Sequence, residues 1–320
     1  MQDNTEIIHI SGENTPELHK VKTLWDYIED FLNNHNVRKT SKDRYRKSLK
    51  VFKRWVDENK ISQITKADLI KYNEWLCDDK NEFSNLTIGA YLVAVRLFYA
   101  YLYEEDIIPK DIAKKLVNPE AIKTHQRKAL TEEQCGKLIN YYKSRGRLRD
   151  FAMVNLMIRC GLRTIEVVRA KIEDICMISG KRALMVWGKG RTNKTDMVLL
   201  EDPAHTPIAQ YLEGRQWHSK SEYLFVSESR NSKGERITTK TVSATVREGL
   251  DAIGLTGAEY TAHALRNTCA TLLLKQGISL QRVQQVMRHN NMNTTQGYVH
   301  DIEVEKRIEE SPEAALNNLF

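Results

Sequence analysis

The chain has 320 residues, of which 41% are hydrophobic, with a formal net charge of +7 and a pI of about 9.0. This length favours two or three modules over one very large domain, and the hydrophobic content excludes a disordered chain. The basic charge favours a polyanionic partner, although many other soluble proteins share it.

The cysteines and the apolar stretches indicate the compartment. The five cysteines form no CxxC pair and no regular framework, which favours reduced, mostly buried thiols. Residues 1–20 lack the layout of a secretory signal and are expected to be a loose tail. The most apolar helix-like stretch, FAMVNLMI at 151–158, is far shorter than the roughly 20 residues that a membrane span requires. We therefore expect a soluble, cytoplasmic protein with no membrane partner.

Residues 21–116 predict a small all-helical module. Apolar residues recur at helical spacing in four successive segments, and the third opens with a capping box formed by Thr65 and Asp68. No alternation of apolar and polar residues, as in a strand, interrupts them. The four segments are LWDYIEDFL at 24–32, TSKDRYRKSLKVFKRWVDENK at 40–60, TKADLIKYNEWL at 65–76 and NLTIGAYLVAVRLFYAYLYEED at 85–106.

The second of these segments is strongly basic. Residues 37–54 carry nine lysines and arginines and one acidic residue, Asp43. Such a run is often only a solvated helix face, but it also suits a helix that lies in the major groove of DNA. We expect the apolar stripe to anchor the helix while Lys42, Arg46 and Lys53 project elsewhere. The residues predicted to contact DNA are Arg38, Lys39, Lys42, Arg44, Arg46, Lys53, Arg96 and Arg191.

A basic, irregular stretch separates this module from the next. It runs from Pro109 to Ala129, and we place an interdomain linker at 117–129. A second domain is expected over 130–320. It opens with a capping box formed by Thr131 and Gln134.

The second domain mixes helices with one small sheet. A helix over 149–160 is expected to end at Gly161, a residue suited to the left-handed cap position. Residues 183–187 and 196–200 predict the two strands of a β-hairpin with a glycine-rich, basic turn at 188–194. Helices resume from about 239. The predicted fold class is mainly α with a small antiparallel sheet, in two domains.

Three segments of this domain carry residues suited to holding a phosphate. In HALRN, His263 and Arg266 lie three positions apart at the start of a helix and therefore share one face. The segment CGLRTIEVVRA supplies Arg163 with Glu166 nearby, and VWGKGRTNK supplies Lys189 at the hairpin turn.

A fourth segment, MRHNNMNTTQGYVH at 287–300, supplies His289 and, nine residues later, Tyr298. In order and spacing the four segments resemble those of the tyrosine recombinases, or phage integrase family, and the resemblance covers roughly residues 21–320. It implies a SAM-like helical core-binding domain followed by an α+β catalytic domain. It also implies a catalytic set with Glu166 in support, namely Arg163, Lys189, His263, Arg266, His289 and Tyr298.

The residue types suit the chemistry of that family. A tyrosine phenol can conserve the energy of a broken phosphodiester bond in a phosphotyrosyl link, so neither a metal nor a cofactor is expected. Two guanidinium groups and two histidines offer donors for the charge that builds on the phosphate, and a lysine can protonate the leaving 5′ oxygen. The resemblance implies a site-specific DNA recombinase that acts through a 3′-phosphotyrosyl intermediate and a Holliday junction.

The same resemblance implies the partners. They are double-stranded DNA, further copies of the chain in a tetrameric synapse on two DNA sites, and accessory DNA-bending or directionality proteins, all in the nucleoid. The apolar C-terminal segment EAALNNLF at 313–320 is expected to dock onto a neighbouring protomer, although it can also fold back on its own domain. Only about 20 residues precede the helical module. This predicts a simple recombinase of the Xer-like or small mobile-element kind, without the arm-binding domain of larger phage integrases.

Two positions depart from the usual pattern of the family. Asn267 replaces a second histidine, at a position outside the core catalytic set. Arg288 replaces the glycine that usually precedes the second catalytic histidine, so it adds a positive group near the pocket.

Other interpretations remain open at this point. Arg163 can be an ordinary ion-pair partner of Glu166, and Lys194 competes with Lys189 for the role of the acid. A type IB topoisomerase would share the pocket and the nucleophile, and a DNA-binding regulator would carry an inactive pocket. The turn GKGRTNKT does not fit a phosphate-binding P-loop, because Asn193 stands where the second glycine is required.

Overall fold

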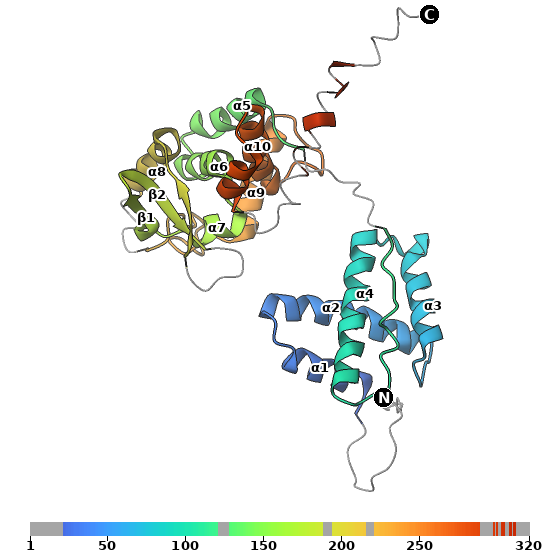
Figure 1. Ribbon diagram of the computed structural model, residues 1–320. Helices are drawn as coiled ribbons and strands as arrows, with labels where there is room; N and C mark the ends of the chain where they lie inside the picture. The colour runs from blue at the N-terminus through green and yellow to red at the C-terminus, as the bar shows by residue number, and fades with distance from the viewer. Residues whose placement is uncertain are drawn as a thin grey trace, which may run out of the picture. The chain divides into compact units, whose positions relative to one another are not determined.

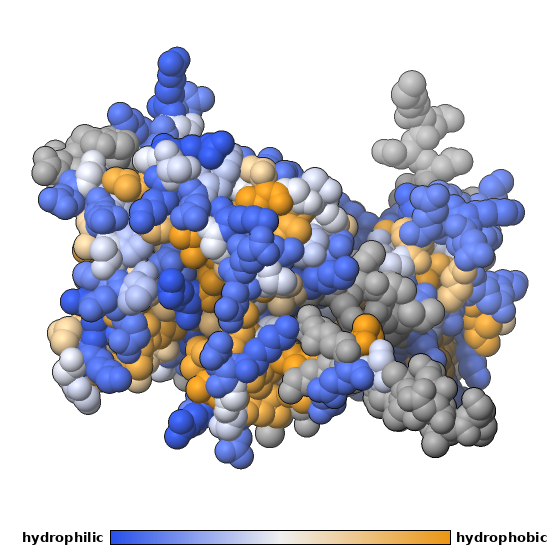
Figure 2. Space-filling model, turned by 90° about the horizontal axis from the view of Figure 1, so that it is seen from above, coloured by the Kyte–Doolittle hydropathy of each residue, from blue (hydrophilic) through white to orange (hydrophobic). Residues whose placement is uncertain are grey.

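The computed structural model describes residues 22–120, 128–187, 194–215 and 221–288, together with residues 297, 299, 302–304, 307, 308, 310 and 311. The chain divides into two compact units, Met1–Thr124 and His125–Phe320. Each unit has its own hydrophobic core. On the face of the molecule seen in Figure 2, hydrophobic patches are scattered between hydrophilic side chains.

The N-terminal unit is a helical bundle, as its sequence predicts. Helix α2 packs against α4, while α1 and α3 also contact α4 (Figure 1). Reciprocal capping boxes begin two of the helices, Thr23 with Asp26 and Thr65 with Asp68. The helices are α1 (Leu24–Asn34), α2 (Lys39–Glu58), α3 (Lys66–Cys77) and α4 (Asn85–Glu104), with a 3-10 turn at Asp79–Asn81.

Helix α4 is the centre of this bundle. Among the described residues it is the one helix long and apolar enough, at 20 residues, to cross a membrane by length and composition. The expectation that the apolar helical stretches fall far short of the length of a membrane span was therefore wrong. The core accounts for the apolar character of α4, because Leu92, Val95 and Phe98 are fully buried in it.

The segment after α4 runs back along that helix. Arg96 donates from Nη1 to the carbonyl oxygen of Leu116 at 2.7 Å and to Oδ1 of Asn118 at 2.9 Å. Near the start of α4, Asn85 donates to the carbonyl oxygen of Glu120 at 2.6 Å. Arg96, which was predicted to contact DNA, thus makes its described contacts within the N-terminal unit.

The C-terminal unit is built around α6, which is buried along almost its whole length. Helices α5, α8 and α10 pack against α6, and the three-stranded sheet lies beside them (Figure 1). The helices of this unit are α5 (Glu132–Lys143), α6 (Leu148–Cys160), α7 (Thr164–Arg169), α8 (Asp202–Gly214), α9 (Thr239–Ala252), α10 (Ala262–Lys275) and α11 (Leu280–Met287).

The predicted hairpin is present. Strands β2 (Lys181–Val186) and β3 (Asp196–Leu199) pair antiparallel, with Met185 opposite Met197. A further strand, β1 (Ile175–Ile178), pairs antiparallel with β2 and was not predicted, so the sheet order is β1-β2-β3. The tip at 188–193, with Lys189 and Arg191, lies outside the described residues.

Helix α8 was also not predicted, because two prolines interrupt its sequence. Pro203 lies in the first turn, where a missing N–H costs nothing. Pro207 lies inside the helix and leaves the carbonyl oxygen of Pro203 without its usual helical donor. The buried Asn155 of α6 donates to that oxygen at 2.7 Å, so α6 compensates for the interruption.

Candidate active site

Arg163 lies at a tight turn between two helices. Helix α6 ends at Gly161, which has a φ of 58°, and Arg163 is the N-cap of α7. A Cβ at Gly161 would lie 2.8 Å from Sδ of Met287 and 3.3 Å from Sγ of Cys269. The turn therefore requires glycine both for its left-handed backbone and for the close approach of α10 and α11.

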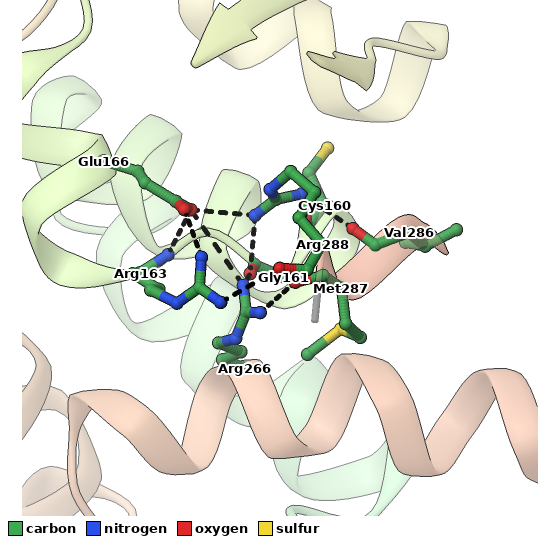
Figure 3. A network of polar contacts seen from close by, with 8 residues as sticks. All are labelled: Cys160, Gly161, Arg163, Glu166, Arg266, Val286, Met287 and Arg288. Carbon is green, nitrogen blue, oxygen red and sulfur yellow. Dashed lines mark hydrogen bonds and ion pairs between the residues drawn. The ribbon is translucent and has the colours of Figure 1, made fainter. Parts of the chain in front are cut away.

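Glu166 is the centre of the polar network drawn in Figure 3. Its side chain is 2% exposed. Its Oε1 accepts from Nη1 of Arg163 at 2.6 Å. Its Oε2 accepts from the backbone N–H of Arg163 at 2.8 Å and from Nη2 of Arg288 at 2.8 Å, and lies 4.0 Å from Nη1 of Arg266.

The three arginines keep Glu166 ionised. Burial alone would raise the pKa of Glu166, but the charge of Arg288, the N–H of Arg163 and the charges of Arg163 and Arg266 hold that pKa below its ordinary value. A buried carboxylate with three guanidinium neighbours is therefore the electrostatic core of this site.

Arg266 joins the ends of two helices. It projects from α10, is 1% exposed, and donates from Nη1 to the carbonyl oxygen of Gly161 and from Nη2 to that of Met287. Arg163 donates from Nη2 to the carbonyl oxygen of Arg288 at 3.3 Å, so the same two chain segments are linked twice (Figure 3). The side chain of Arg163 remains 20% exposed and is the more accessible of the two.

Four residues of the predicted catalytic site are described, and three of them are in direct contact or close to it. Arg163, Arg266 and Glu166 lie in one network, and His263 occupies the first turn of α10, partly buried, one turn before Arg266. The predicted pair of Arg163 with Glu166 exists, but it is one part of a larger cluster. The remaining members of the predicted catalytic set, which are Lys189, His289 and Tyr298, lie outside the described residues.

Arg288 is the functional candidate that the sequence indicated only in part. Its place before His289 indicated an extra positive group near the pocket, and Nη2 of Arg288 lies 2.8 Å from Glu166. Its φ of 53° also explains why glycine is usual at this position. The sequence did not indicate that the guanidinium turns inward to Glu166.

Lys194, the alternative to Lys189, is held by acidic partners. Its Nζ donates to Oδ1 of Asp174, whose side chain is 3% exposed, and lies 4.0 Å from Glu173. It also lies 5.8 Å from the ring centroid of Trp187. This ammonium group is therefore engaged at the base of the hairpin.

The residues predicted to bind DNA on α2 fall into two groups. Arg46 pairs with Glu29 of α1 at 3.0 and 2.8 Å, Lys53 pairs with Asp57 at 2.5 Å, and Lys42 donates to the carbonyl oxygen of Asn33 at 3.1 Å. Each of these three side chains thus has an acceptor within reach, on α1 or one turn along α2. The exposed residues of the predicted set on this helix and at its N-cap are Arg38, Lys39 and Arg44.

No group of three or more histidine, cysteine or acidic side chains that could hold a metal ion occurs within the described part of the chain. The chemistry that the described site offers is instead a dense set of guanidinium donors around one carboxylate. Such donors suit a phosphate oxyanion.

Both units match the models of known protein families. The model of the phage integrase family matches residues 128–304, and that of the phage integrase N-terminal SAM-like domain matches residues 24–106. Tyrosine recombinase XerC of Caldanaerobacter subterraneus subsp. tengcongensis is 30% identical over 263 residues, 80% of this chain and 71% of that protein. Tyrosine recombinase XerA of Pyrococcus furiosus is 35% identical over 231 residues, 71% of this chain and 75% of that protein.

Solved structures share the fold. The XerH site-specific recombinase bound to palindromic difH substrate, in a post-cleavage complex, matches with a TM-score of 0.70 at 19% identity, over 91% of this chain and 84% of that one. A lambda integrase dimer bound to a COC′ core site matches with a TM-score of 0.64 at 18% identity, over 85% of this chain and 97% of that one.

Proposed function

Because this chain belongs to the phage integrase family and is a tyrosine recombinase, an enzyme that cuts and rejoins DNA at specific sites, we propose that the cluster around Glu166 holds the scissile phosphate. The observation that carries this proposal is the convergence of Arg163 and Arg266 on Glu166, at 2.6 and 4.0 Å, from segments far apart in the sequence. A buried carboxylate fixes both cations before the substrate arrives.

The charge of the cluster suits a phosphodiester. Three guanidinium groups, those of Arg163, Arg266 and Arg288, less the one carboxylate of Glu166, leave a net charge of +2. A phosphodiester carries one negative charge, and a second develops on its non-bridging oxygens as a fifth bond forms to phosphorus. The preorganised positive charge therefore favours the transition state over the ground state.

We assign the nucleophile to Tyr298. Its phenolic oxygen would form the bond to phosphorus as the bond from phosphorus to the 5′ oxygen breaks, and the phenol proton would pass to a neighbouring base. The product is a 3′-phosphotyrosyl link and a free 5′ hydroxyl. Attack by another 5′ hydroxyl reverses the step and joins new strands, so no external energy source enters the balance. His263 and His289 are assigned to the phosphate as further donors.

We assign the general acid to Lys189, which would give its proton to the leaving 5′ oxygen. The contacts of Lys194 support this choice over its rival. The ammonium of Lys194 is held by the buried Asp174, and moving it to the phosphate would leave that carboxylate without its described cation.

The N-terminal unit supplies a basic face for the DNA. Arg38, Lys39 and Arg44 are exposed at the N-terminal end of α2. Among the described residues they are therefore the strongest candidates for contacts with DNA phosphates. Lys42, Arg46 and Lys53 would have to exchange their present partners for the DNA.

The wider assembly is also proposed from the family. Four copies of the chain would act on two duplex sites, with residues 312–320 of one copy docked on the next, and with accessory DNA-bending or directionality proteins at some sites. The working compartment would be the cytoplasm, at the nucleoid.

A two-site plasmid experiment tests the proposed function. A binding selection from a random duplex library supplies the preferred site, and two copies of it are placed on one supercoiled plasmid. We expect reciprocal products with a junction at the selected site, and none with Tyr298→Phe. Relaxation of supercoils without exchange would indicate a topoisomerase instead, and binding with neither product would indicate a regulator.

A further inference from the structure

Arg288 occupies a costly position. It caps the C-terminus of α11 with a φ of 53° and a ψ of 47°, a left-handed conformation that residues other than glycine rarely adopt. Its side chain is only 4% exposed, so a full positive charge is removed from water. Its Nε is buried without a hydrogen bond within the part of the chain that the structure describes. These three costs argue against a role in stability alone.

The side chain joins the two helix ends that frame the site. Nη1 donates to the carbonyl oxygens of Val286 at 2.7 Å and Cys160 at 3.4 Å. Nη2 donates to the carbonyl oxygen of Gly161 at 3.2 Å and to Oε2 of Glu166 at 2.8 Å. The end of α6 and the end of α11 are thus held by one guanidinium, directly beside the turn that carries Arg163 (Figure 3).

The contact between Arg288 and Glu166 determines which guanidinium groups pair with the Glu166 carboxylate. Three cations face this carboxylate in the described structure: Arg163 from the N-cap of α7, Arg266 from α10 and Arg288 from the end of α11. Arg163 takes Oε1 and Arg288 takes Oε2, while Arg266 remains 4.0 Å away. Without Arg288 the net charge of the cluster would fall from +2 to +1, and Oε2 would lose its guanidinium partner and could draw Arg266 closer.

From this geometry we infer that Arg288 is a positioning residue for strand cleavage, which occupies Glu166 so that Arg163 and Arg266 stay directed at the phosphate. The inference rests on the proposed function, since it concerns the same phosphate pocket. Arg288 touches Glu166 and backbone carbonyls and is not assigned to the phosphate itself. It should therefore change the rate of cleavage much more than the affinity for DNA.

The chain offers well-matched variants for the test. Arg288→Gly introduces a residue that readily adopts the left-handed backbone, so the fold should be retained. Arg288→Lys keeps the charge but loses the fork that reaches Glu166 and three carbonyl oxygens together. Arg282→Ala removes an exposed arginine from the same helix and controls for the general loss of positive charge.

The experiment measures DNA binding and single-turnover cleavage of a nicked duplex by the full chain. For Arg288→Gly we expect binding within about threefold of the wild type and cleavage slower by about tenfold to a hundredfold. Arg288→Lys should fall between the two, and Arg282→Ala should match the wild type. A non-denaturing concentration of guanidinium chloride should restore part of the cleavage rate of Arg288→Gly and should not speed the other proteins. The same concentration of sodium chloride is the reference. The rescue is expected because the free guanidinium cation can enter the vacated place beside Glu166.

The outcomes separate this inference from the proposed function. If the wild type forms no covalent adduct, the proposed function fails and the inference fails with it. If the wild type cleaves and Arg288→Gly cleaves within twofold of it, only the inference is overturned. A slow Arg288→Gly that guanidinium does not rescue, with an equal loss of stability, would also overturn it, since Arg288 would then be a structural residue.

Discussion

Among the described residues, Glu166 is the one on which three arginine side chains of the site converge. The sequence motifs identified Arg163 and Arg266 as phosphate ligands because of their type and spacing, and they placed Glu166 nearby. They could not indicate that one carboxylate bridges arginines from three segments, because that contact depends on how the ends of α6 and α11 approach each other. The same contact buries Arg288 within the site, where the sequence indicated only a positive group near the pocket.

Replacing Glu166 by Gln should destabilise the protein. The change leaves three buried or half-buried guanidinium groups without their shared anion, which should lower the free energy of unfolding by about 3–5 kcal/mol. Because the pKa of Glu166 in the folded protein lies below its ordinary value of 4.5, its ion pairs stabilise fully above pH 4.5 and are lost as the pH falls through the folded-state pKa. Urea unfolding should therefore show a constant gap between the two proteins near neutral pH that closes in acid. A gap that widened as the pH fell would contradict this account of Glu166.

The two lysines of the hairpin can be distinguished by a substrate with sulfur in place of the 5′ oxygen. A thiolate leaves without protonation, so this substrate should restore cleavage to Lys189→Ala. Lys194→Ala should lose stability through the uncompensated Asp174 and should gain nothing from the sulfur. Cleavage rates on the oxygen and sulfur substrates measure how far sulfur rescues each variant. Rescue of Lys194→Ala without rescue of Lys189→Ala would move the role of general acid to Lys194.

At the scale of helices and strands, periodicity and caps located most of the fold. The helices of the N-terminal unit, the end of α6 at Gly161 and the strands β2 and β3 follow the patterns of their sequences. Strand β1 was missed because its short run, ICMI, shows no alternation of apolar and polar residues, and α8 was missed because Pro203 and Pro207 are typical of loops. The return of residues 107–120 along α4 was missed because its hydrogen bonds join groups distant in sequence.

Arg96→Ala should release this returning segment. The variant loses hydrogen bonds to Leu116 and Asn118, which together should contribute about 1–3 kcal/mol to the stability of the N-terminal unit. Trypsin should then cut faster after Lys114 and Lys115, just before the released contacts. Arg54→Ala is the control, since Arg54 is exposed and only approaches Glu58 at 3.8 Å. Equal cutting of both variants would show that Arg96 does not hold the segment.

At the scale of the whole molecule, the chain combines two units with separate hydrophobic cores. The basic surface of α2 belongs to the N-terminal unit, and the arginine cluster belongs to the C-terminal unit. The order of the motifs was sufficient to predict this family, because four segments with phosphate chemistry rarely coincide in that order. The roles of Lys189, His289 and Tyr298 rest on the resemblance, since these three residues lie outside the described part of the chain.

Deletion of residues 312–320 tests the proposed assembly. If this apolar segment docks on a neighbouring copy, its loss should leave binding to one DNA site unchanged while synapsis and recombination weaken. Gel shifts measure the first property and a two-plasmid assay measures the second. Recombination at the wild-type rate would exclude docking between copies, and weakened single-site binding would indicate that the segment folds back on its own domain.

The most direct test of the central claim is covalent capture on a nicked duplex that carries the selected site. The nick lets the short 5′-hydroxyl strand diffuse away after cleavage, so the enzyme stays attached to the 3′ phosphate. Mass spectrometry of the adduct from the wild type should place the nucleotide on Tyr298, and Tyr298→Phe should bind the duplex equally well without forming any adduct. An adduct that persisted in Tyr298→Phe, or one mapped to another residue, would contradict the account.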